Sequence, residues 1–472
     1  MTTSLELLLT TAFIAVVSAA LSLAVGIPFG NWLRSLGPGL GRVIATLTLV
    51  PFLLPPLLIG LAVVGVFGEL EINSNSGMLF VVLAHAFMNF GFIAKVFAGS
   101  TVDSEQIEAA RLDGAADSAI RRKIELPQQI PGLVSAALLV ALYSATSYGL
   151  VLTLGAGKVK TLETEIAIAT LQQLDLDTAA IYAALQTLLT IAMFLVAKSV
   201  SGTPGALDQI EKSILRPTWL QRAIGTALVA LVVAALVAIV ARMFARPGFL
   251  SNIANLSTKG ERQLLNITVL DASLNSVRNA LVVVLITLPM AYLLASTKRP
   301  SGLVLLPIGI SPVVIGLATL ALAGYLPREL TSSWILLPLI QALFALPVAY
   351  QILRPAHSAI DRDVIEASRL DGASRIRTAV LIELPLIKKS IALAVAFSAM
   401  VSIGEFGAAS FLAFGSNETL PIVLYKLLGR PGEENLGMAM TVAGIYILIS
   451  AYIIWLSLKP TQTRRRTSSI AR

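Results

Sequence analysis

The sequence predicts an all-α polytopic membrane protein made of two homologous helical bundles in tandem, with about 11 transmembrane helices. Three observations predict this fold class. Apolar residues make up 56% of the 472 residues and charged residues only 13%, whereas soluble globular domains carry about 25% charged residues. The apolar residues fall in runs of about 20, the length of a helix that crosses a bilayer. Two stretches of the chain also repeat each other 258 positions apart.

Eleven apolar runs are long enough to cross about 30 Å of hydrocarbon as helices. They span residues 5–29, 44–67, 78–98, 130–154, 179–200, 222–244, 273–296, 303–325, 334–353, 389–414 and 436–458. The alternation of apolar and polar residues that marks an outer-membrane barrel is absent. Residues 1–5 include no basic side chain, so the first run is interpreted as a retained helix and not as a secretory signal.

The composition excludes several classes of function. The chain has no cysteine, which removes disulfides, thiolate chemistry and Cys-based metal sites. Its two histidines, His85 and His357, are too few and too far apart for a His-based metal site. The net charge of +8 fits the positive-inside bias and contact with anionic membrane lipids better than binding to nucleic acid. We expect no catalytic residue and no metal in this chain.

The Lys and Arg residues predict how the chain crosses the membrane. If the N-terminus lies outside, the loops at 30–43, 99–129, 201–221, 297–302 and 354–388 and the C-terminal tail face the cytoplasm. These regions and their borders hold 25 of the 35 Lys and Arg residues. We therefore expect the N-terminus outside and the C-terminus in the cytoplasm.

The stretch 201–221 is a long polar segment between two apolar runs. It contains four residues that break helices, namely Gly202, Pro204, Gly205 and Pro217. We interpret it as a cytoplasmic linker that joins a first half, residues 1–200, to a second half, residues 222–472.

The internal repeat is the most specific signal in the sequence. Residues 108–127 (EAARLDGAADSAIRRKIELP) and 366–385 (EASRLDGASRIRTAVLIELP), called the repeat segments below, are identical at 11 of 20 positions. The same spacing relates further pairs, which are Tyr148 and Phe406, Gly149 and Gly407, Gly157 and Gly415, Thr161 and Thr419, and Leu162 and Leu420. Pro28 and Pro289 are expected to end the first core helix of each half. A parallel duplication of this kind places a transport pathway near the bilayer midplane, between the halves.

The repeat segments resemble the EAA motif of the membrane subunits of bacterial type I ABC importers. The motif is Glu-Ala-Ala, then Gly, then Ile-x-Leu-Pro ten residues later. The matching residues are Glu108, Ala109, Ala110, Gly114, Ile124, Leu126 and Pro127, and then Glu366, Ala367, Gly372, Ile382, Leu384 and Pro385, with Ser368 in place of the second Ala. The resemblance implies the MetI-like permease fold in each half.

The resemblance also implies what the segments do. In this family the motif forms a helix, a break and a second helix that dock into a groove on the ATPase, and its Glu pairs with a basic residue there. This assigns coupling loops to residues 101–129 and 354–388, with Glu108 and Glu366 as docking residues and Gly114 and Gly372 at the break. A simpler interpretation is that Gly114 and Gly372 only permit a tight turn.

The resemblance covers nearly the whole chain, which is similar to permeases that carry both halves in one polypeptide. The stretches 83–90 (LAHAFMNF) and 404–432 are similar to the ferric-iron and thiamine importer branch. The implied partners are two copies of a cytoplasmic ABC ATPase, which binds the ATP and Mg, and an extracytoplasmic solute-binding protein, at the bacterial inner membrane. That branch has six helices in each half, and the first half here has five, so an N-terminal helix is either absent or precedes the given start.

A nucleotide site within the chain is not supported. The nearest match to a phosphate-binding loop is GAGK at 155–158. Such a loop needs Gly five residues before its Gly-Lys pair and Ser or Thr after it, and Leu152 and Val159 occupy those positions. We therefore expect no cofactor in this chain, and the energy for transport must come from a separate subunit.

Three polar residues within apolar runs are candidates for the translocation pathway. His85 and Asn89 lie four positions apart on one helix face, and Glu405 lies inside the tenth run. An ionisable residue in the membrane indicates a pathway by default, and the alternative is a hydrogen bond between helices that stabilises the bundle. The leading function is thus the permease of an ABC importer for ferric iron or thiamine. The alternative is a secondary transporter with its own ion coupling, which would not need a repeated cytoplasmic segment.

Overall fold

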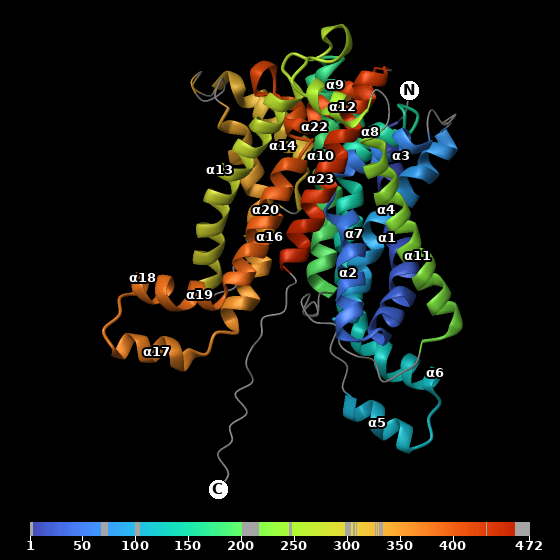
Figure 1. Cartoon of the computed structure of the whole chain (residues 1–472), viewed down its shortest axis with the longest axis vertical. Coiled ribbons are helices and arrows are strands. Elements are labelled where there is room, and N and C mark those ends of the chain that lie inside the picture. The colour runs from blue at the N-terminus through green and yellow to red at the C-terminus, as the bar shows by residue number, and fades with distance from the viewer. Residues whose placement is uncertain are drawn as a thin grey trace.

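The computed structural model describes residues 3–67, 74–99, 104–200, 217–244, 248–297, 309–325, 334–430 and 432–457, together with Val304, Pro307, Pro327 and Glu329. Every regular element in these ranges is a helix. The chain forms two helical bundles side by side, from which two short helical segments project at the same end (Figure 1). The predicted fold class is confirmed.

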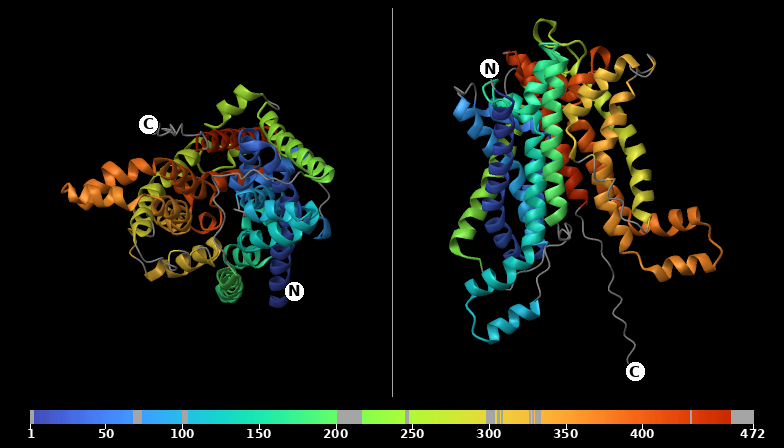
Figure 2. Two further views of the ribbon diagram at one scale, coloured as in Figure 1. Left: turned by 90° about the horizontal axis from the view of Figure 1, so that it is seen from below. Right: turned by 180° about the vertical axis from the view of Figure 1, so that it is seen from behind.

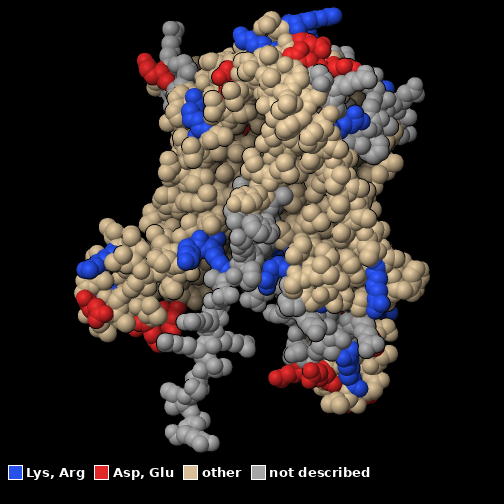
Figure 3. All heavy atoms as spheres, in the orientation of Figure 1, with Lys and Arg blue, Asp and Glu red and all other residues tan. Residues whose placement is uncertain are grey.

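Seven of the described helices are long and apolar enough to cross a membrane. They span Ser4–Ser35, Ser76–Ala98, Asp117–Ala145, Leu176–Ala197, Trp219–Arg242, Val269–Ser296 and Leu336–Ser358. Charged side chains gather toward the two ends of the molecule, and the band between them is largely uncharged (Figure 3). This band is what a membrane-spanning protein must present to hydrocarbon, where an unpaired charge is costly.

The first part of the chain, up to the predicted linker, contains eleven elements. They are α1 (Ser4–Ser35), α2 (Gly37–Leu53), α3 (Pro56–Phe67), α4 (Ser74–Ala98), α5 (Ser104–Leu112), α6 (Asp117–Ile120), the π-helical turn η1 (Arg121–Glu125), α7 (Leu126–Ala145), α8 (Tyr148–Leu154), α9 (Leu162–Leu171) and α10 (Leu176–Val200). Helix α1 is the centre of this bundle, because it packs against α2, α4, α7 and α10.

The rest of the chain begins with α11 (Trp219–Arg242), α12 (Phe249–Asn255) and η2 (Glu261–Gln263), and from α13 (Val269–Ser296) onward it follows a similar order. Its other elements are α14 (Pro312–Leu322), η4 (Ala323–Tyr325), α16 (Leu336–Ser358), α17 (Arg362–Leu370), α18 (Arg375–Thr378), the π-helical turn η5 (Ala379–Glu383), α19 (Leu384–Leu386), α20 (Lys388–Gly404), α21 (Ala409–Leu412), η6 (Gly415–Asn417), α22 (Leu420–Leu428) and α23 (Glu433–Ser457). Helices α13, α16 and α20 pack together, as α1, α4 and α7 do in the first bundle.

Four of the apolar runs are not single helices, which corrects the expectation of one unbroken helix for each. In the run 303–325, α14 begins only at Pro312, after the extended Ser311, and the other three runs are broken between two helices. The run 44–67 is interrupted at Leu54, whose backbone is extended before α3 begins at Pro56. The run 130–154 is interrupted at Thr146 and Ser147, and the run 389–414 after Gly404. Apolar periodicity could not show these breaks because the residues on both sides of each break are equally apolar.

Two prolines were expected to end helices and do not. Pro28 lies inside α1, which continues to Ser35, and Pro289 lies inside α13, which continues to Ser296. A proline removes one backbone hydrogen bond from a helix. Membrane helices tolerate this because neighbouring groups satisfy the freed carbonyl, and both prolines lie within helices that are packed on other helices.

The helix α11 belongs by sequence to the second half but packs against α1 as well as α23. It covers one side of the first bundle (Figures 1 and 2). Trp32 of α1 lies so close to Gly225 of α11 that a Cβ there would come within 2.4 Å of the indole ring. Helix α11 begins at Trp219, inside the predicted linker, and residues 201–216 of that linker lie outside the described residues. The division into halves at 200 and 222 remains a prediction.

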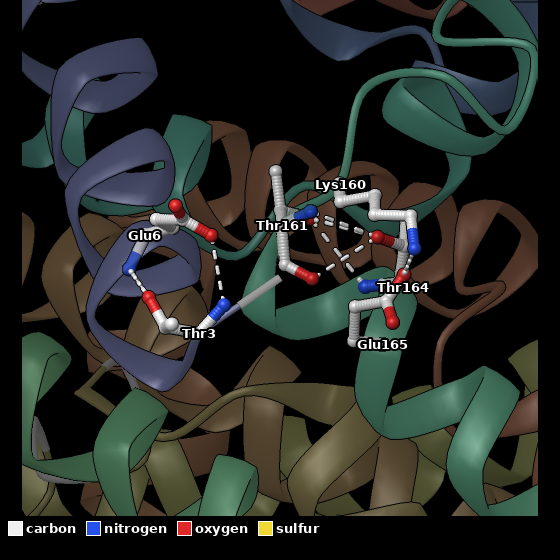
Figure 4. Close-up of polar contacts among 6 residues, drawn as sticks. All are labelled: Thr3, Glu6, Lys160, Thr161, Thr164 and Glu165. Atoms are coloured by element: carbon white, nitrogen blue, oxygen red, sulfur yellow. Dashed lines mark hydrogen bonds and ion pairs between the residues drawn. The ribbon is translucent and has the colours of Figure 1, made fainter. Parts of the chain in front are cut away.

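Both α1 and α9 begin at the end of the molecule opposite the projecting segments, and each begins with a capping box (Figure 4). The Thr3 Oγ1 accepts from the Glu6 amide at 3.2 Å, and the Thr3 amide donates to Glu6 Oε2 at 2.8 Å. Thr161 and Thr164 make the same exchange at 3.4 and 2.9 Å. These caps satisfy amides that the first turn of a helix leaves free, and so fix where α1 and α9 begin.

Candidate functional site

The two repeat segments fold in the same way. In the first, α5 is followed by a turn, by α6 and the π-helical turn η1, and then by the start of α7. In the second, α17 is followed by a turn, by α18, by η5 and by α19. Both project from the same end of the molecule, away from the N-terminus (Figures 1 and 2). The predicted arrangement of a helix, a break and a second helix is confirmed in both halves.

Gly114 and Gly372 form the break with the same geometry. Each has φ +80°, a left-handed conformation that side chains with a Cβ disfavour. The Ala115 amide donates to the Ala110 carbonyl at 2.9 Å, and the Gly114 amide donates to the Arg111 carbonyl at 3.0 Å. The second segment has the same two hydrogen bonds, both 3.0 Å long. This is the Schellman ending of a helix, and it turns the chain sharply after α5 and α17.

The motif residues on α5 and α17 face solvent. Glu108, Ala109, Glu366 and Ala367 are all exposed. The last residue of each helix is a leucine that exposes 89% of its surface, Leu112 in α5 and Leu370 in α17. An exposed leucine beside an exposed carboxylate, presented twice with the same geometry, is a surface suited to a protein partner.

The other face of each segment holds it in shape. In the first segment, Ile107 of α5 and Ile120 of α6 are buried against each other, with Ile124 packed beside them. In the second, the hydroxyl groups of Ser368 and Thr378 lie 3.0 Å apart and are buried. Each repeat segment is therefore a small folded unit.

The motif ends where a π-helical turn continues into the next helix. In the first half the membrane helix runs unbroken from Asp117 to Ala145, which corrects the expectation that Pro127 lies at its start. Leu126 and Leu384 each follow a π-helical turn, and their amides donate to the carbonyls of Arg121 and Ala379, five residues earlier. Pro127 and Pro385 come next, inside helical backbone that continues from η1 into α7 and from η5 into α19. Proline cannot donate to the carbonyl four residues before it, which accounts for the wider turn at both sites.

The structure separates the three candidate pathway residues. His85 and Asn89 lie on α4, which packs against α1, α2, α7 and α8 of the first half. The Asn89 side-chain amide donates to the His85 carbonyl at 2.7 Å within the helix, and both residues are buried. The helix α4 makes its main contacts within the first half, which favours the alternative of a stabilising role.

Glu405 does lie at the interface between the halves. It is the first residue after α20, and its Oε1 and Oε2 accept from the amides of Ala408 and Ala409 at 2.6 and 3.1 Å. Next to it, the ring of Phe406 stacks on the ring of Tyr148 from the first half, with centroids 5.2 Å apart and an interplanar angle of 13°. The carboxylate therefore sets the local backbone conformation at this interface.

The three helix breaks meet at this stacked pair. A Cβ on Gly404 would lie 2.6 Å from Pro55, and one on Gly149 would lie 3.2 Å from Phe406. An apolar cavity next to them is lined by residues of both halves, among them Pro55, Leu57, Leu58, Ile403, Leu420 and Leu424. The interface is thus closed by apolar and aromatic contact where the backbone of both halves is interrupted.

Sequence reasoning missed a polar contact between the halves. Glu163, the second residue of α9, accepts a hydrogen bond of 2.7 Å from the Ser311 hydroxyl at the start of α14. Both residues are fully buried. No local pattern links residues 148 positions apart, and the only available signal was an acidic side chain in the first turn of a predicted helix. For the stack of Tyr148 on Phe406 the sequence did contain a signal, because the two residues occupy equivalent positions of the repeat.

The fold and the repeat segments define a permease of the ABC importer class. Residues 22–246 and 274–459 match the family of binding-protein-dependent transport system inner membrane components. Because the two matches cover most of the chain, it belongs to this family. It is a transmembrane subunit of a binding-protein-dependent importer and forms the translocation pathway. The secondary transporter alternative is not supported.

Relatives of two kinds are similar to the chain. The Thiamine transport system permease protein ThiP of Brucella abortus is 26% identical over 463 residues, which covers 88% of this chain and 80% of the relative. A "Probable molybdenum ABC transporter permease protein" of Haloferax volcanii is 32% identical over 215 residues, 42% of this chain and 78% of the relative. The Molybdenum transport system permease protein ModB of Haemophilus influenzae is 27% identical over 173 residues, 33% of this chain and 76% of the relative. The first alignment extends over both halves and therefore fits a fused permease.

We expect the hydrogen bond from Ser311 to Glu163 to contribute to the attachment of the two halves. Ser311→Ala and Glu163→Gln should each lower the free energy of unfolding by about 1–3 kcal/mol, because each disturbs a buried hydrogen bond of a carboxyl group. The double variant should cost less than the sum of the two single variants. Thermal unfolding in detergent of the parent protein, the two single variants and the double variant measures these free-energy changes. Fully additive losses would show that the two side chains do not interact.

Proposed function

We propose that the two repeat segments are the docking sites of two copies of a cytoplasmic ABC ATPase. The observation that carries the proposal is the duplicated surface of α5 and α17, with its exposed glutamates, its exposed leucines and its identical turns. The proposal assigns docking to Glu108, Ala109, Glu366 and Ala367. Leu126, Pro127, Leu384 and Pro385 join the segments to the membrane helices.

ATP and Mg are proposed to bind to the partner and not to this chain. The one stretch of sequence that resembles a phosphate loop, residues 155–158, forms a turn between α8 and α9. This turn is at the end of the molecule opposite the repeat segments (Figure 1). A nucleotide at that turn would be on the far side of the membrane from the docking surface.

The proposed orientation is supported by the same geometry. The N-terminus and the repeat segments are at opposite ends of the molecule (Figure 1). If the ATPase is cytoplasmic, the N-terminus is outside. Helix α23 begins near the N-terminal end of the molecule and runs toward the end that carries the repeat segments, which supports a cytoplasmic C-terminus. The extracytoplasmic solute-binding protein is proposed to dock on the opposite surface, where α9, α12 and α22 lie.

The proposed solute is thiamine or ferric iron. The stretches at 83–90 and 404–432 support this branch, and so does the thiamine permease relative, whose similarity extends over both halves. The molybdenum permease relatives cover less than half of this chain, and molybdate is the second candidate. The binding protein determines much of the specificity in such systems, so its ligand decides between them.

The pathway is proposed to run between the halves, through the position of Tyr148 and Phe406. These rings and the apolar residues around them close the interface in this structure. Glu405 is proposed to take part because it determines the backbone conformation next to Phe406. His85 and Asn89 are not assigned to the pathway, since α4 packs within the first half.

The direct test of the proposed function is assembly and transport. The chain should copurify with its ATPase as one permease with two ATPase copies, because it has two docking segments. Uptake of the solute should require that ATPase. Uptake that persists after every candidate ATPase gene is deleted would contradict the proposal.

The turns and the glutamates of the repeat segments should have separable effects. Gly114→Val or Gly372→Val forces a β-branched residue to a φ of +80°, a left-handed conformation that costs about 1–2 kcal/mol. Substrate-stimulated ATP hydrolysis and uptake should fall together, with membrane insertion preserved. Glu108→Lys or Glu366→Lys should instead weaken ATPase association. Full coupled activity in all four variants would refute the coupling assignment.

Glu405→Gln tests the pathway assignment. The amide is a weaker acceptor than the carboxylate for the Ala408 and Ala409 amides, so the interface next to Phe406 should lose its defined closed conformation. We expect slower transport with unchanged ATPase association, measured as initial uptake rates and copurification. Normal transport kinetics would leave Glu405 with a purely structural role.

A further inference from the structure

Each repeat segment contains, two residues before its last residue, a buried glutamate at the variable position of the motif. Glu125 is the last residue of η1, and Glu383 is the last residue of η5. They occupy equivalent positions of the repeat, 258 residues apart, and expose only 2% and 8% of their surface. Burial of a carboxylate is costly unless it is paired, so the partners of these residues are informative.

In the first half the partner is an arginine. Arg34 lies in the last turn of α1, is also buried, and donates from Nη1 to Glu125 Oε1. Its guanidinium carbon lies 6.0 Å from the centroid of the Phe97 ring, near the end of α4. The glutamate thus connects the end of the repeat segment to α1, beside α4.

In the second half two different residues make the equivalent contact. The hydroxyl group of Tyr292, on α13, donates to Glu383 Oε2 at 2.5 Å. The Nε2 atom of His357, in the last turn of α16, lies 3.0 Å from the same oxygen. The rings of Tyr292 and His357 meet edge to face, with centroids 6.0 Å apart.

The partners come from corresponding helices of the two halves. Arg34 is on α1 and Tyr292 is on α13, the first core helix of each half, and His357 is in the last turn of α16. The first half therefore places one long arginine opposite its glutamate. The second half uses a shorter tyrosine on its first core helix and adds a histidine from α16. The residues differ, but in both halves the glutamate is bound to the first core helix.

Stability alone does not explain why both halves keep this arrangement. Replacing a buried ion pair with well-packed apolar residues is often neutral or stabilising. A hydrogen-bonded carboxylate adds directional contact instead, which holds two elements in one relative position. Both glutamates stand at the end of a π-helical turn, where the helix departs from regular α-helical hydrogen bonding and where bending is easiest.

We propose that Glu125 and Glu383 are positioning residues for transport, which fasten each repeat segment to the first core helix of its own half. The inference rests on the proposed docking of the ATPase at these segments. When a docked segment is displaced, the glutamate carries the displacement past the π-helical turn to α1 or α13. The bundle of that half then moves as a unit, as alternating access requires.

The test uses the full permease with its ATPase and binding protein in proteoliposomes. In Glu125→Gln and Glu383→Gln, solute taken up per ATP hydrolysed should fall about tenfold, the factor expected for loss of one hydrogen bond between charged groups. Association with the ATPase should stay at the wild-type level, because Glu108 and Glu366 are unchanged. Glu433→Gln, an exposed glutamate at the start of α23, is the matched control and should leave both measurements unchanged.

A second measurement needs no ATPase and so separates this inference from the docking proposal. The chain has no cysteine, so spin labels can be placed at Asp113→Cys and Gly39→Cys, two exposed positions on the first repeat segment and at the start of α2. The distance distribution between them should be broader in Glu125→Gln than in the labelled parent. An unchanged distance distribution would overturn the proposal that Glu125 holds the first repeat segment to α1.

Double variants at Tyr292 and His357 distinguish loss of the contact with Glu383 from general unfolding of the protein. Tyr292→Arg combined with His357→Gly gives Glu383 an arginine partner on the first core helix, as Glu125 has, and should retain uptake per ATP. His357→Gly with Tyr292→Phe removes both side chains that contact Glu383 and should reproduce the loss in Glu383→Gln. Wild-type coupling in Glu125→Gln and Glu383→Gln would overturn the proposal. A loss of uptake in step with lost ATPase association would also overturn it, because the residues would then belong to docking.

Discussion

The requirement that every backbone polar group in the membrane be satisfied by the protein itself governs this structure. Water is absent from the hydrocarbon region, so an interrupted helix can exist there only where other protein surrounds it. The interruptions at Leu54, after Gly404 and at Thr146 obey this rule, because all three meet between the two halves. The backbone is therefore interrupted where the two halves meet and cover each other.

This arrangement puts the movable part of the molecule at its centre. Aromatic stacking of Tyr148 on Phe406 and the contacts of Pro55 with Gly404 are apolar and lack strong directional bonds, so the halves can separate there without leaving a buried charge unpaired. The hydrogen bond between Ser311 and Glu163 is a polar contact across the same interface. The repeat segments, in contrast, are held to their own halves by buried glutamates. Mainly apolar contacts between the halves and directional polar contacts within each half suit rigid-body motion.

The two halves also show how a duplicated protein diverges without losing a contact. The repeat segments keep the same turns and the same exposed leucines, but the contacts beneath them differ. Isoleucines hold the first segment together and a pair of hydroxyl groups holds the second. The same holds for the arginine that meets Glu125 and for the tyrosine and histidine that meet Glu383. A surface that binds the proposed ATPase must keep the shape and the side chains that the ATPase recognises. An internal contact needs only a side chain long enough to reach its partner.

Much of this protein could be predicted from the sequence alone, because the relevant physics is local or periodic. Long apolar runs predicted membrane helices, and the repeat predicted two halves and two identical projecting segments with a turn at Gly114 and Gly372. The repeat also marked Tyr148 and Phe406 as equivalent positions. The tertiary structure decided what depends on residues distant in the chain. It placed Glu405 between the halves and His85 on a helix whose main contacts are within the first half, although both are polar residues in apolar runs. It brought Arg34 to Glu125 and Ser311 to Glu163, pairs that no local pattern joins, because a hydrogen bond depends on where two side chains meet in space and not on their separation in sequence.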